Sequence, residues 1–372
     1  MIIAGIGFSC LFRGGDRFSI PIAESGFEGS SLNLRKTKIV PTPDTAIDRQ
    51  SNTVWCASFL AAWKLLEEDL AVEPSLQGSP EAVAALNRAQ DPRPGIPDEN
   101  LYAAAGWSQK GIIDRITKDL AQKFPSKAPP AFPGISSDSI VTYAYLETNL
   151  KFSLPYFQNR KPMVFTDCDG VKTELSSFGI RPEDNYAYFE LRKQPRILYV
   201  ARDEKYQVTE CVIDLDRTSA DNQIVLALVA PGSTLTGMLA SIEEKIKTTE
   251  KKEMHDDLGP NDVLLVPDIV WHITHHYVEL EGKEFTNSEL KGQRIDIALQ
   301  DIQFRLDRNG AELKSEDKTY MMPAPTYYVF NRPFIIYIKK RGAKIPYFVM
   351  RVENAELLTK WNVSKTPDKS IN

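Results

Sequence analysis

The order of patterns along the chain predicts an α+β fold. Helical periodicity dominates residues 52–123, whereas short runs rich in β-branched and aromatic residues follow from residue 138 onward. The chain shows no internal repeat and no regular alternation of strand and helix patterns, which argues against a parallel βαβ architecture. We therefore expect N-terminal helices packed on large, mostly antiparallel β-sheets.

Four helices are expected. Residues 52–70 are apolar almost all round, which predicts a deeply buried helix. A second helix begins near Ser79 and Pro80, because serine is a favourable N-cap and proline suits the first helical position. Apolar residues at helical spacing predict a third helix over 107–123 and a fourth over 234–248.

From residue 138 onward, short apolar runs predict strands. QIVLALVAP (223–231) is continuously apolar, as expected of a central strand. In MVFTDCDGVKTELSSF (163–178), Asp169-Gly170 predicts a type I′ hairpin turn between two short strands. The other predicted strands lie in IVTYAYLETNLKF (140–152), YAYFELRK (186–193), RILYVARDEKYQVTECVIDL (196–215), VLLVPDIVWHITHHYVEL (263–280), IDIALQDIQFRLD (295–307), FIIYIKK (334–340) and PYFVMRV (346–352).

The composition is that of an ordinary globular protein. Of the 372 residues, 42% are hydrophobic, which is ample apolar material for a large core. The net charge is -5 and the basic residues form no separate block, so we expect no nucleic-acid partner. No apolar run approaches the length of a membrane span, so we expect no membrane association.

We divide the chain into a leading segment (1–48), a single domain (49–360) and a C-terminal tail (361–372). The start, MIIAGIGFSCLF, lacks the basic region and the cleavage site of a secretory signal. A buried first strand is the favoured expectation, and a truncated export signal is the alternative.

The cysteines leave the redox compartment open. Cys10, Cys56, Cys168 and Cys211 form no CxxC pair, and one disulfide or four free thiols are equally allowed. Cys56 lies in an apolar stretch, which predicts an inert core thiol. The motifs G-x-S-x-G, GxGxxG, HExxH and the phosphate-binding loop are absent from the sequence. We therefore expect neither an enzyme nor a cofactor.

Three of the four histidines cluster in one predicted strand. His272, His275 and His276, with Asp268 as a fourth ligand, suggest a metal-dependent hydrolase as a distant alternative. On a strand, however, His272 and His276 share one face while His275 points to the other. We therefore expect no metal site.

Residues 304–334 form an unusual connection between two predicted strands. The start of the segment alternates apolar and polar residues, and FIIYI (334–338) is strongly apolar. Between them lie charges, two methionines and two prolines. A charged segment of this length inside a compact domain requires a functional explanation.

The C-terminal part of the chain resembles the closing strands of the serpins, the serine-protease-inhibitor superfamily. The resemblance is carried by VFNRPFIIYIKKRGAKIPYFVMRVEN (329–354). Phe330-Asn331-Arg332-Pro333-Phe334 is similar to the Phe-Asn-x-Pro-Phe strand of that family. Phe348–Val352 is similar to its final strand, with Met350 where the family usually has glycine. Upstream, IQFRLDRNGAELKSE (302–316) resembles the strand and hinge that begin the serpin reactive-centre loop.

Weaker matches extend the resemblance over residues 50–354 in the family's order. NTVWCASFL (52–60) resembles the buried N-terminal helix, with Cys56-Ala57 in place of Ser-Pro. VTYAYLETN (141–149) resembles a strand of the main sheet, with Tyr143 where asparagine is expected. DVLLVPDIVWHITHHYVEL (262–280) resembles a further strand. The departures at Cys56, Ala57 and Tyr143 fall where the family opens its sheet.

The resemblance implies a monomeric protein that holds out a loop as bait for a serine protease. In serpins the native fold is metastable, and the cleaved loop inserts into the main sheet and distorts the trapped acyl-enzyme. The target implied here is a chymotrypsin-like or elastase-like enzyme, and family analogy implies a secreted protein. The implied reactive-loop residues are Tyr320, Met321, Met322, Pro323, Ala324 and Pro325, and the implied hinge residues are Asn309, Gly310, Ala311, Glu312, Leu313, Ser315 and Asp317.

The position of the scissile bond stays open. Counting forward from Gly310 by the family's spacing puts Ala324 before the cut, whereas counting back from Phe330 puts Met322 there. Proline follows in both registers, and proline after the scissile bond blocks most serine proteases. Tyr320-Met321 and Met321-Met322 are the nearby cleavable bonds.

Two functions are therefore expected to compete. Insertion as a strand would turn Ala311, Leu313, Ser315 and Asp317 to one face and Glu312, Lys314, Glu316 and Lys318 to the other. Leu313 is larger than the small residues expected in a hinge, and burying it on insertion would cost about 1–3 kcal/mol. Burying Asp317 without a partner would cost further free energy. The chain is thus either a protease trap or a non-inhibitory binding protein with the same fold, in which the charged hinge and the prolines prevent insertion.

Overall fold

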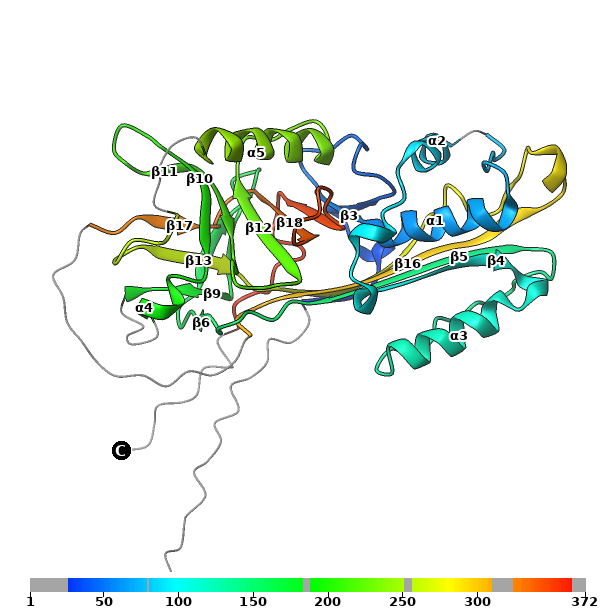
Figure 1. The fold of residues 1–372 in the computed structure, drawn as a ribbon, viewed down its shortest axis with the longest axis horizontal. Helices are drawn as coiled ribbons and strands as arrows, with labels where there is room; N and C mark the ends of the chain where they lie inside the picture. The colour runs from blue at the N-terminus through cyan, green and yellow to red at the C-terminus, as the bar shows by residue number, and fades with distance from the viewer. Residues whose placement is uncertain (1–25, 79, 183–187, 251–255, 310–323, 363–372) are drawn as a thin grey trace, which may run out of the picture.

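The computed structural model describes residues 26–78, 80–182, 188–250, 256–309 and 324–362 (Figure 1). The described helices are few and the sheets are large, which confirms the predicted α+β class. The helices are α1 (Ala57–Leu70), α2 (Glu81–Arg88), α3 (Ile112–Lys123), α4 (Tyr188–Leu191) and α5 (Leu235–Glu250).

One of the two large sheets has six strands, in the order β1-β14-β16-β5-β4, with β15 paired to β16. Its strands are β1 (Phe27–Ser30), β14 (Ile269–His276), β16 (Arg294–Leu306), β5 (Ile140–Asn149), β4 (Leu101–Trp107) and β15 (Lys283–Glu284). In Figure 1 these strands run lengthwise, with α1 and α2 above them and α3 below.

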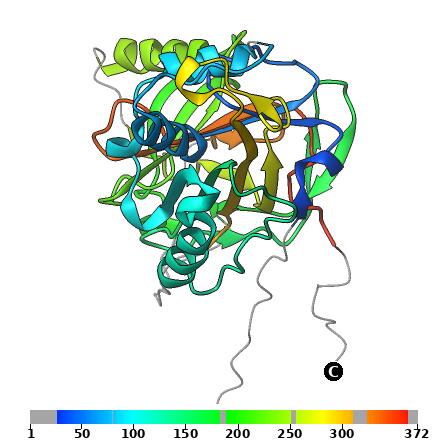
Figure 2. The ribbon, with the colours of Figure 1, turned by 90° about the vertical axis from the view of Figure 1, so that its right-hand side faces the viewer.

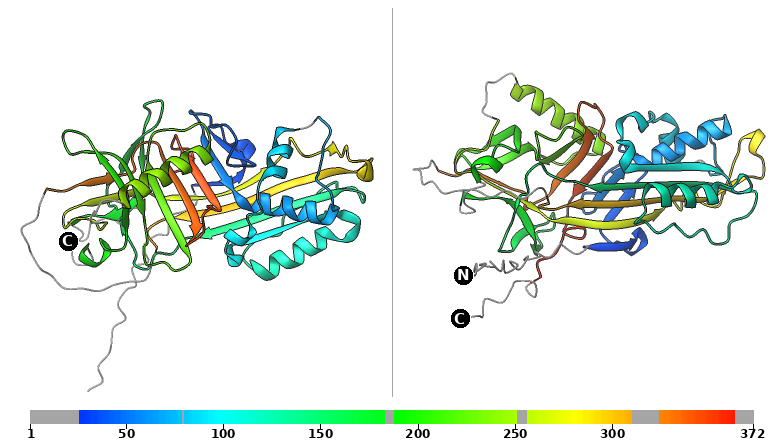
Figure 3. Two further views of the ribbon diagram at one scale, coloured as in Figure 1. Left: turned by 45° about the horizontal axis from the view of Figure 1, so that its top comes forward. Right: turned by 60° about the horizontal axis from the view of Figure 1, so that its bottom comes forward.

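A seven-stranded sheet crosses the first, in the order β10-β11-β12-β18-β19-β3-β2. Its strands are β10 (Arg196–Arg202), β11 (Val208–Asp214), β12 (Asn222–Leu228), β18 (Phe334–Lys340), β19 (Phe348–Val352), β3 (Asn52–Cys56) and β2 (Thr37–Val40). α5 lies across the outer side of this sheet (Figure 3).

Two smaller sheets complete the described strands. One has the order β17-β13-β9-β6 and the other is the hairpin β7-β8. Their strands are β17 (Tyr327–Val329), β13 (Val263–Pro267), β9 (Ser177–Ile180), β6 (Phe157–Gln158), β7 (Met163–Thr166) and β8 (Lys172–Leu175). Gly179 of β9 passes so close to β13 that an added Cβ would lie 1.8 Å from the Leu264 carbonyl oxygen. Only glycine fits that contact.

The main core lies between the two large sheets. Phe304 of β16 stacks on Trp271 of β14 at 5.3 Å between ring centroids, and on Phe348 of β19 at 4.5 Å. A second apolar cluster packs α1 against one face of the six-stranded sheet, and a third packs α3 against the other face. A strand whose two faces are both covered consists mostly of apolar residues. This is why apolar runs from residue 138 onward predict the strands.

Several predicted elements differ from the structure. The predicted helix over 52–70 is strand β3 followed by α1, because residues 52–56 pair with β19 and β2 on both sides. The helix predicted from residue 107 begins at Ile112, since Trp107 ends β4 and Gly111 has a φ of 76°. The predicted strand 186–193 is wrong: residues 188–191 form α4.

The hairpin over 163–175 is present, but its turn is not type I′. A type I′ turn needs positive φ at both central residues, and here Gly170 has positive φ (80°) while Asp169 does not. Instead the Asp167 carboxylate accepts hydrogen bonds from the backbone N–H groups of Asp169 (3.0 Å) and Val171 (2.8 Å). The aspartate thus stabilises a longer loop that the dipeptide alone does not predict.

Part of the predicted leading segment belongs to the sheets. β1 pairs in parallel with β14, and β2 pairs in parallel with β3. Residues 1–12, predicted as a first strand, lie outside the described residues. Cys56, Cys168 and Cys211 are free thiols, and Cys10 lies outside the described residues. Over the described part of the chain, the helices are all too short or too polar to cross a membrane.

Candidate functional site at the loop root and the parallel seam

The predicted bait segment connects two different sheets. β16 ends at Leu306 in the six-stranded sheet, and β17 begins at Tyr327 in the four-stranded sheet. Of the predicted hinge and reactive-loop residues, Asn309, Ala324 and Pro325 are described, and all three are exposed. The others lie outside the described residues: Gly310, Ala311, Glu312, Leu313, Ser315, Asp317, Tyr320, Met321, Met322 and Pro323.

Both ends of the segment are anchored. At the first end, which we call the loop root (residues 307–309), the carbonyl oxygens of Arg308 and Asn309 accept hydrogen bonds from the N–H groups of Tyr156 (3.0 Å) and Phe152 (3.1 Å). At the other end, the backbone N–H of Thr326 donates to a carboxylate oxygen of Asp262 at 2.9 Å. The segment therefore starts and finishes at fixed points.

A buried carboxyl group lies beside the loop root. Asp268 is 1% exposed, and one of its oxygens accepts a hydrogen bond from Gln158 Nε2 at 2.7 Å while the other has no partner. Burial raises the pKa of Asp268 to about 7, and the charge of Asp307 contributes to the shift. Asp307 is itself buried and forms an ion pair with Arg305.

The position next to β16 in the sheet is already filled. β5 and β16 pair in parallel from Ile140 opposite Ile295 to Asn149 opposite Arg305, and we call this pair the seam. Because both strands end at the loop root, a strand that enters the sheet from the root would have to separate the seam from that end. No described strand lies between the two.

A group of polar side chains on the α3 side fastens the seam, and we call it the outer clasp (Lys127, Tyr143, Tyr145, Asp301 and Gln303). The hydroxyl of Tyr143 on β5 donates to Asp301 Oδ2 on β16 at 3.0 Å, and the hydroxyl of Tyr145 donates to Gln303 Oε1 at 3.1 Å. Lys127 Nζ lies 3.2 Å from Asp301 Oδ2 and 5.3 Å from the ring centroid of Tyr145. The clasp therefore joins both strands and the segment after α3.

A second group holds β16 from the opposite face, and we call it the inner clasp (Cys56, Ser58, Tyr277 and Gln300). Gln300 Nε2 donates to the Cys56 carbonyl oxygen at 3.1 Å and to Ser58 Oγ at 2.9 Å. The hydroxyl of Tyr277 donates to Gln300 Oε1 at 2.8 Å. Burial raises the pKa of Cys56 to about 11, which fits the predicted inert core thiol.

The three clustered histidines have separate partners. His272 Nε2 lies 3.0 Å from Lys127 Nζ, His275 Nδ1 lies 2.8 Å from Ser31 Oγ, and His276 Nδ1 lies 2.7 Å from Glu281 Oε1. Burial lowers the pKa of His275 to about 4, whereas the hydrogen bond that His276 donates to Glu281 raises the pKa of His276. Among the described residues, no group of three or more His, Cys, Asp or Glu side chains is placed to hold a metal ion.

The sequence indicated only half of this site. Tyr143 and Cys56 were singled out, and the structure places them in the outer and the inner clasp. Asp301 and Gln300 were missed, although polar residues inside the apolar run IDIALQDIQF are a signal for buried hydrogen bonds. Lys127 reaches the outer clasp from a loop, and its local sequence gives no indication of that contact.

No protein-family profile matches the chain, and no curated protein matches it in sequence. Solved structures do match. Native protease nexin-1 with heparin superposes with a TM-score of 0.50 at 9% identity, over 82% of this chain and 92% of that one. Mouse protein-Z dependent protease inhibitor gives 0.50 at 14% identity, over 82% and 91%.

A third structure, thyroxine-binding globulin in complex with thyroxine, gives a TM-score of 0.48 at 13% identity, over 82% of this chain and 92% of that one. The first two matches identify the architecture as that of the serpins. The chain therefore has the serpin fold, as the motifs near its C-terminus predicted.

Proposed function

We propose that this protein presents residues 310–325 to a serine protease of chymotrypsin-like or elastase-like specificity. The observation that carries the proposal is the combination of a closed seam and two anchored ends in different sheets. The position beside β16 is taken by β5, which supports a bait role for the connecting segment. The large apolar residues Tyr320, Met321 and Met322 suit the hydrophobic specificity pocket of a chymotrypsin-like enzyme. The proposed role is non-catalytic.

A second candidate is a binding protein of the same fold that does not trap its protease. The two clasps favour it, because insertion must separate Tyr143 from Asp301 and Tyr145 from Gln303 as well as break the seam. A hydrogen bond to a charged group contributes roughly 1.5–3 kcal/mol, so the outer clasp opposes insertion substantially. Leu313 and Asp317 on the inserted face would add to that opposition.

Incubation with chymotrypsin and with elastase distinguishes the two candidates. A trap gives a covalent complex that survives SDS, because the acyl-enzyme is not hydrolysed. A binding protein gives reversible association or simple cleavage, which mass spectrometry should place at Tyr320-Met321 or Met321-Met322.

The matched control carries Tyr320→Asp and Met321→Asp, which removes the two apolar residues that precede the cuts. We expect it to lose cleavage within the loop and to keep its thermal stability. If neither protease binds the wild-type protein or cuts within residues 318–325, both candidates are rejected.

A further inference from the structure

The far edge of the six-stranded sheet forms a groove. β4 is the last strand in the sheet order, and among the described strands only β5 pairs with it. A cavity of about 500 Å³ lies along its other edge. α1 and α3 cover the two faces of the sheet on either side of this edge, as the end-on view shows (Figure 2). The groove lies on the side of β4 that faces away from β5 and the seam, and the proposed function above does not use it.

The edge directs backbone groups toward the groove, and one of them, the Ala105 carbonyl oxygen, already accepts a hydrogen bond from Arg115. Ser108 N donates to Ser139 O at 2.8 Å in continuation of the β4–β5 register. Because hydrogen-bonded and outward-facing residues alternate in an antiparallel pair, the odd-numbered residues Ala103 and Ala105 direct their N–H and C=O groups away from β5. Arg115 Nη2 donates to Ala105 O at 2.9 Å, which independently places that carbonyl on the groove side.

The edge lacks the usual protection against pairing. Exposed edge strands commonly carry lysine, proline or a bulge, which keep other strands away. β4 instead carries three successive alanines and a glycine, residues 103–106, in a regular register with β5. Another backbone can therefore approach Ala103 to the strand spacing of about 4.8 Å, whereas at Ala105 it would have to displace the guanidinium of Arg115.

The rim of the groove is acidic. Glu68, Asp69 and Asp119 line it against one guanidinium, Arg115. Glu68 is paired with Arg93, whereas Asp69 and Asp119 make no ion pair within the described residues. Asp69 also stands in the last turn of α1, where the helix dipole is negative and a carboxylate is unfavourable. The stability of α1 therefore does not explain why a carboxylate stands at this position, whereas the binding of a cationic ligand would explain it.

Tyr102 lies beside the acidic rim, since the charge of Asp119, second to burial, raises its pKa. It lies on β4 among the groove-lining residues and is 9% exposed, and its hydroxyl is buried without a hydrogen-bond partner. A buried hydroxyl with no partner is costly, because it has lost its hydrogen bonds to water.

We propose that this edge of β4 binds an extended peptide segment of a partner protein, rich in lysine or arginine, which adds to the sheet as a further strand. Backbone hydrogen bonds to Ala103 and Ala105 would provide the affinity, and Asp69 and Asp119 would select the cationic side chains. This is the recognition mode of β-strand addition, with charge as the source of specificity.

The test uses the full chain and fluorescent synthetic peptides of about nine residues. The probe alternates lysine with valine, one control peptide alternates glutamate with valine, and a second control is the lysine probe N-methylated at alternate amides. We expect the lysine probe alone to bind, in a single class of sites by fluorescence anisotropy. Amide hydrogen exchange at Ala103 and Ala105 should slow in the complex.

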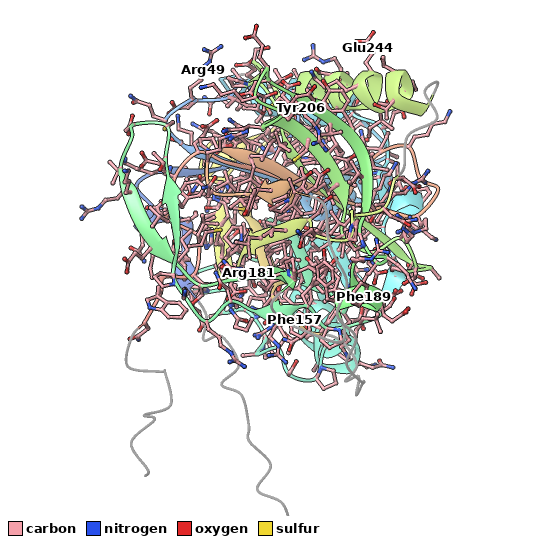
Figure 4. All side chains as sticks on the ribbon, turned by 90° about the vertical axis from the view of Figure 1, so that its left-hand side faces the viewer. Arg49, Phe157, Arg181, Phe189, Tyr206 and Glu244 are labelled. Atoms are coloured by element: carbon pink, nitrogen blue, oxygen red, sulfur yellow. The ribbon has the colours of Figure 1, made fainter. Side chains whose placement is uncertain are left out.

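Variants of the protein separate the backbone contribution from the charge contribution. Ala103→Pro removes an outward donor at a position where an edge strand tolerates proline, and we expect affinity to fall by roughly tenfold or more. Asp69→Asn combined with Asp119→Asn should weaken binding by roughly threefold or more and flatten its salt dependence. Glu244→Gln is the matched control, because Glu244 is exposed on α5, away from the groove (Figure 4), and it should bind as the wild type does.

Each remaining outcome overturns the proposal. These are equal binding of the lysine and glutamate peptides, equal binding of the methylated probe, or no change in exchange at Ala103 and Ala105. Self-association of the unliganded protein that Ala103→Pro abolishes would assign the groove to a second copy of the chain instead. If Ala103→Pro fails to fold, the methylated peptide and the double aspartate variant still decide.

Discussion

Tyr143 shows how one side chain can couple two strands that a serpin-type insertion must separate. It is fully buried on β5, and its hydroxyl donates to the Asp301 carboxylate on β16. A nearby tyrosine on β4, Tyr102, is also buried but has no partner for its hydroxyl. Replacing each of these two tyrosines by phenylalanine therefore separates the contribution of the hydrogen bond across the seam from the contribution of the aromatic ring.

We predict that Tyr143→Phe lowers the free energy of unfolding by about 1–3 kcal/mol, because it deletes a hydrogen bond to a charged group. Tyr102→Phe should be neutral or stabilising, since it removes a buried hydroxyl that has no partner. Urea denaturation of the two variants and the wild type measures both effects. Equal losses in the two variants would show that Tyr143 stabilises the fold only through its ring.

The Asp268 carboxyl group predicts an unusual dependence of stability on pH. Its pKa is about 7 in the folded protein, against an ordinary value of 3.8. Between these values the folded protein retains a proton that the unfolded chain has lost, so this group's contribution to stability falls as pH rises from about 4 to 7. The slope is at most about 1.4 kcal/mol per pH unit, and it vanishes above pH 7.

We therefore predict that Asp268→Asn stabilises the protein at pH 8 relative to the wild type and has little effect at pH 4. The amide keeps an acceptor for Gln158 and carries no charge at any pH. Thermal melts of both proteins from pH 4 to pH 8 test this. Parallel melting curves across the whole range would mean that Asp268 is ionised in the fold at pH 4 already.

β5, β16 and the segment after α3 act together as one closed unit. Lys127 connects them, because it contacts Asp301, His272 and the ring of Tyr145 while being only 12% exposed at its side chain. Removing one partner of a buried ion pair lowers stability more than removing both, because the remaining charge stays buried without a partner. The segment after α3 must therefore be displaced before the seam can open on this face.

We predict that Lys127→Met destabilises the protein by about 3 kcal/mol and speeds amide hydrogen exchange in β5 and β16. Lys123→Met, at the exposed end of α3, should change stability by less than about 0.5 kcal/mol. If the outer clasp is what prevents insertion, loop cleavage should raise the melting temperature of Lys127→Met more than that of the wild type. If amide exchange in β5 and β16 is as slow in Lys127→Met as in the wild type, the outer clasp does not hold the seam closed.

The connectivity of the whole molecule predicts what cleavage of the bait segment does to it. The part of the chain after the segment contributes β17 to one sheet, and β18 and β19 to the middle of another. Nearly all of these residues are buried between other strands. The cleaved protein should therefore keep both fragments together without a covalent link.

We predict that chymotrypsin-cut protein elutes from a sizing column as one particle at the position of the intact protein and separates into two fragments only under denaturing conditions. Its melting temperature distinguishes the candidate functions, because insertion of the cut segment would raise it by completing the sheet. A C-terminal fragment that leaves under native conditions would contradict the described sheet order. The single domain over 49–360 and the monomeric state stay predictions, which sedimentation of the intact protein would test.

The sequence alone determined the fold class and the serpin architecture. Both depend on features that are local or strictly ordered: periodicity, buried apolar runs and the closing motifs at Phe330–Phe334 and Phe348–Val352. The elements it mistook are those where partners distant in the chain decide the conformation. Residues 52–56 have helical periodicity but become β3, because β19 and β2 offer hydrogen bonds on both sides.

The tertiary structure alone decided whether the sheet beside the bait segment is open or closed. Asp301 and Lys127 are ordinary polar residues in the sequence. They become part of the outer clasp only because a parallel pairing joins β5 to β16, which brings Tyr143 to Asp301, 158 positions further along the chain. The same holds for the groove at β4, since an edge exists only once the order of strands is known. Pairing in a sheet is a contact between distant segments, and no local pattern specifies which segment is the neighbour.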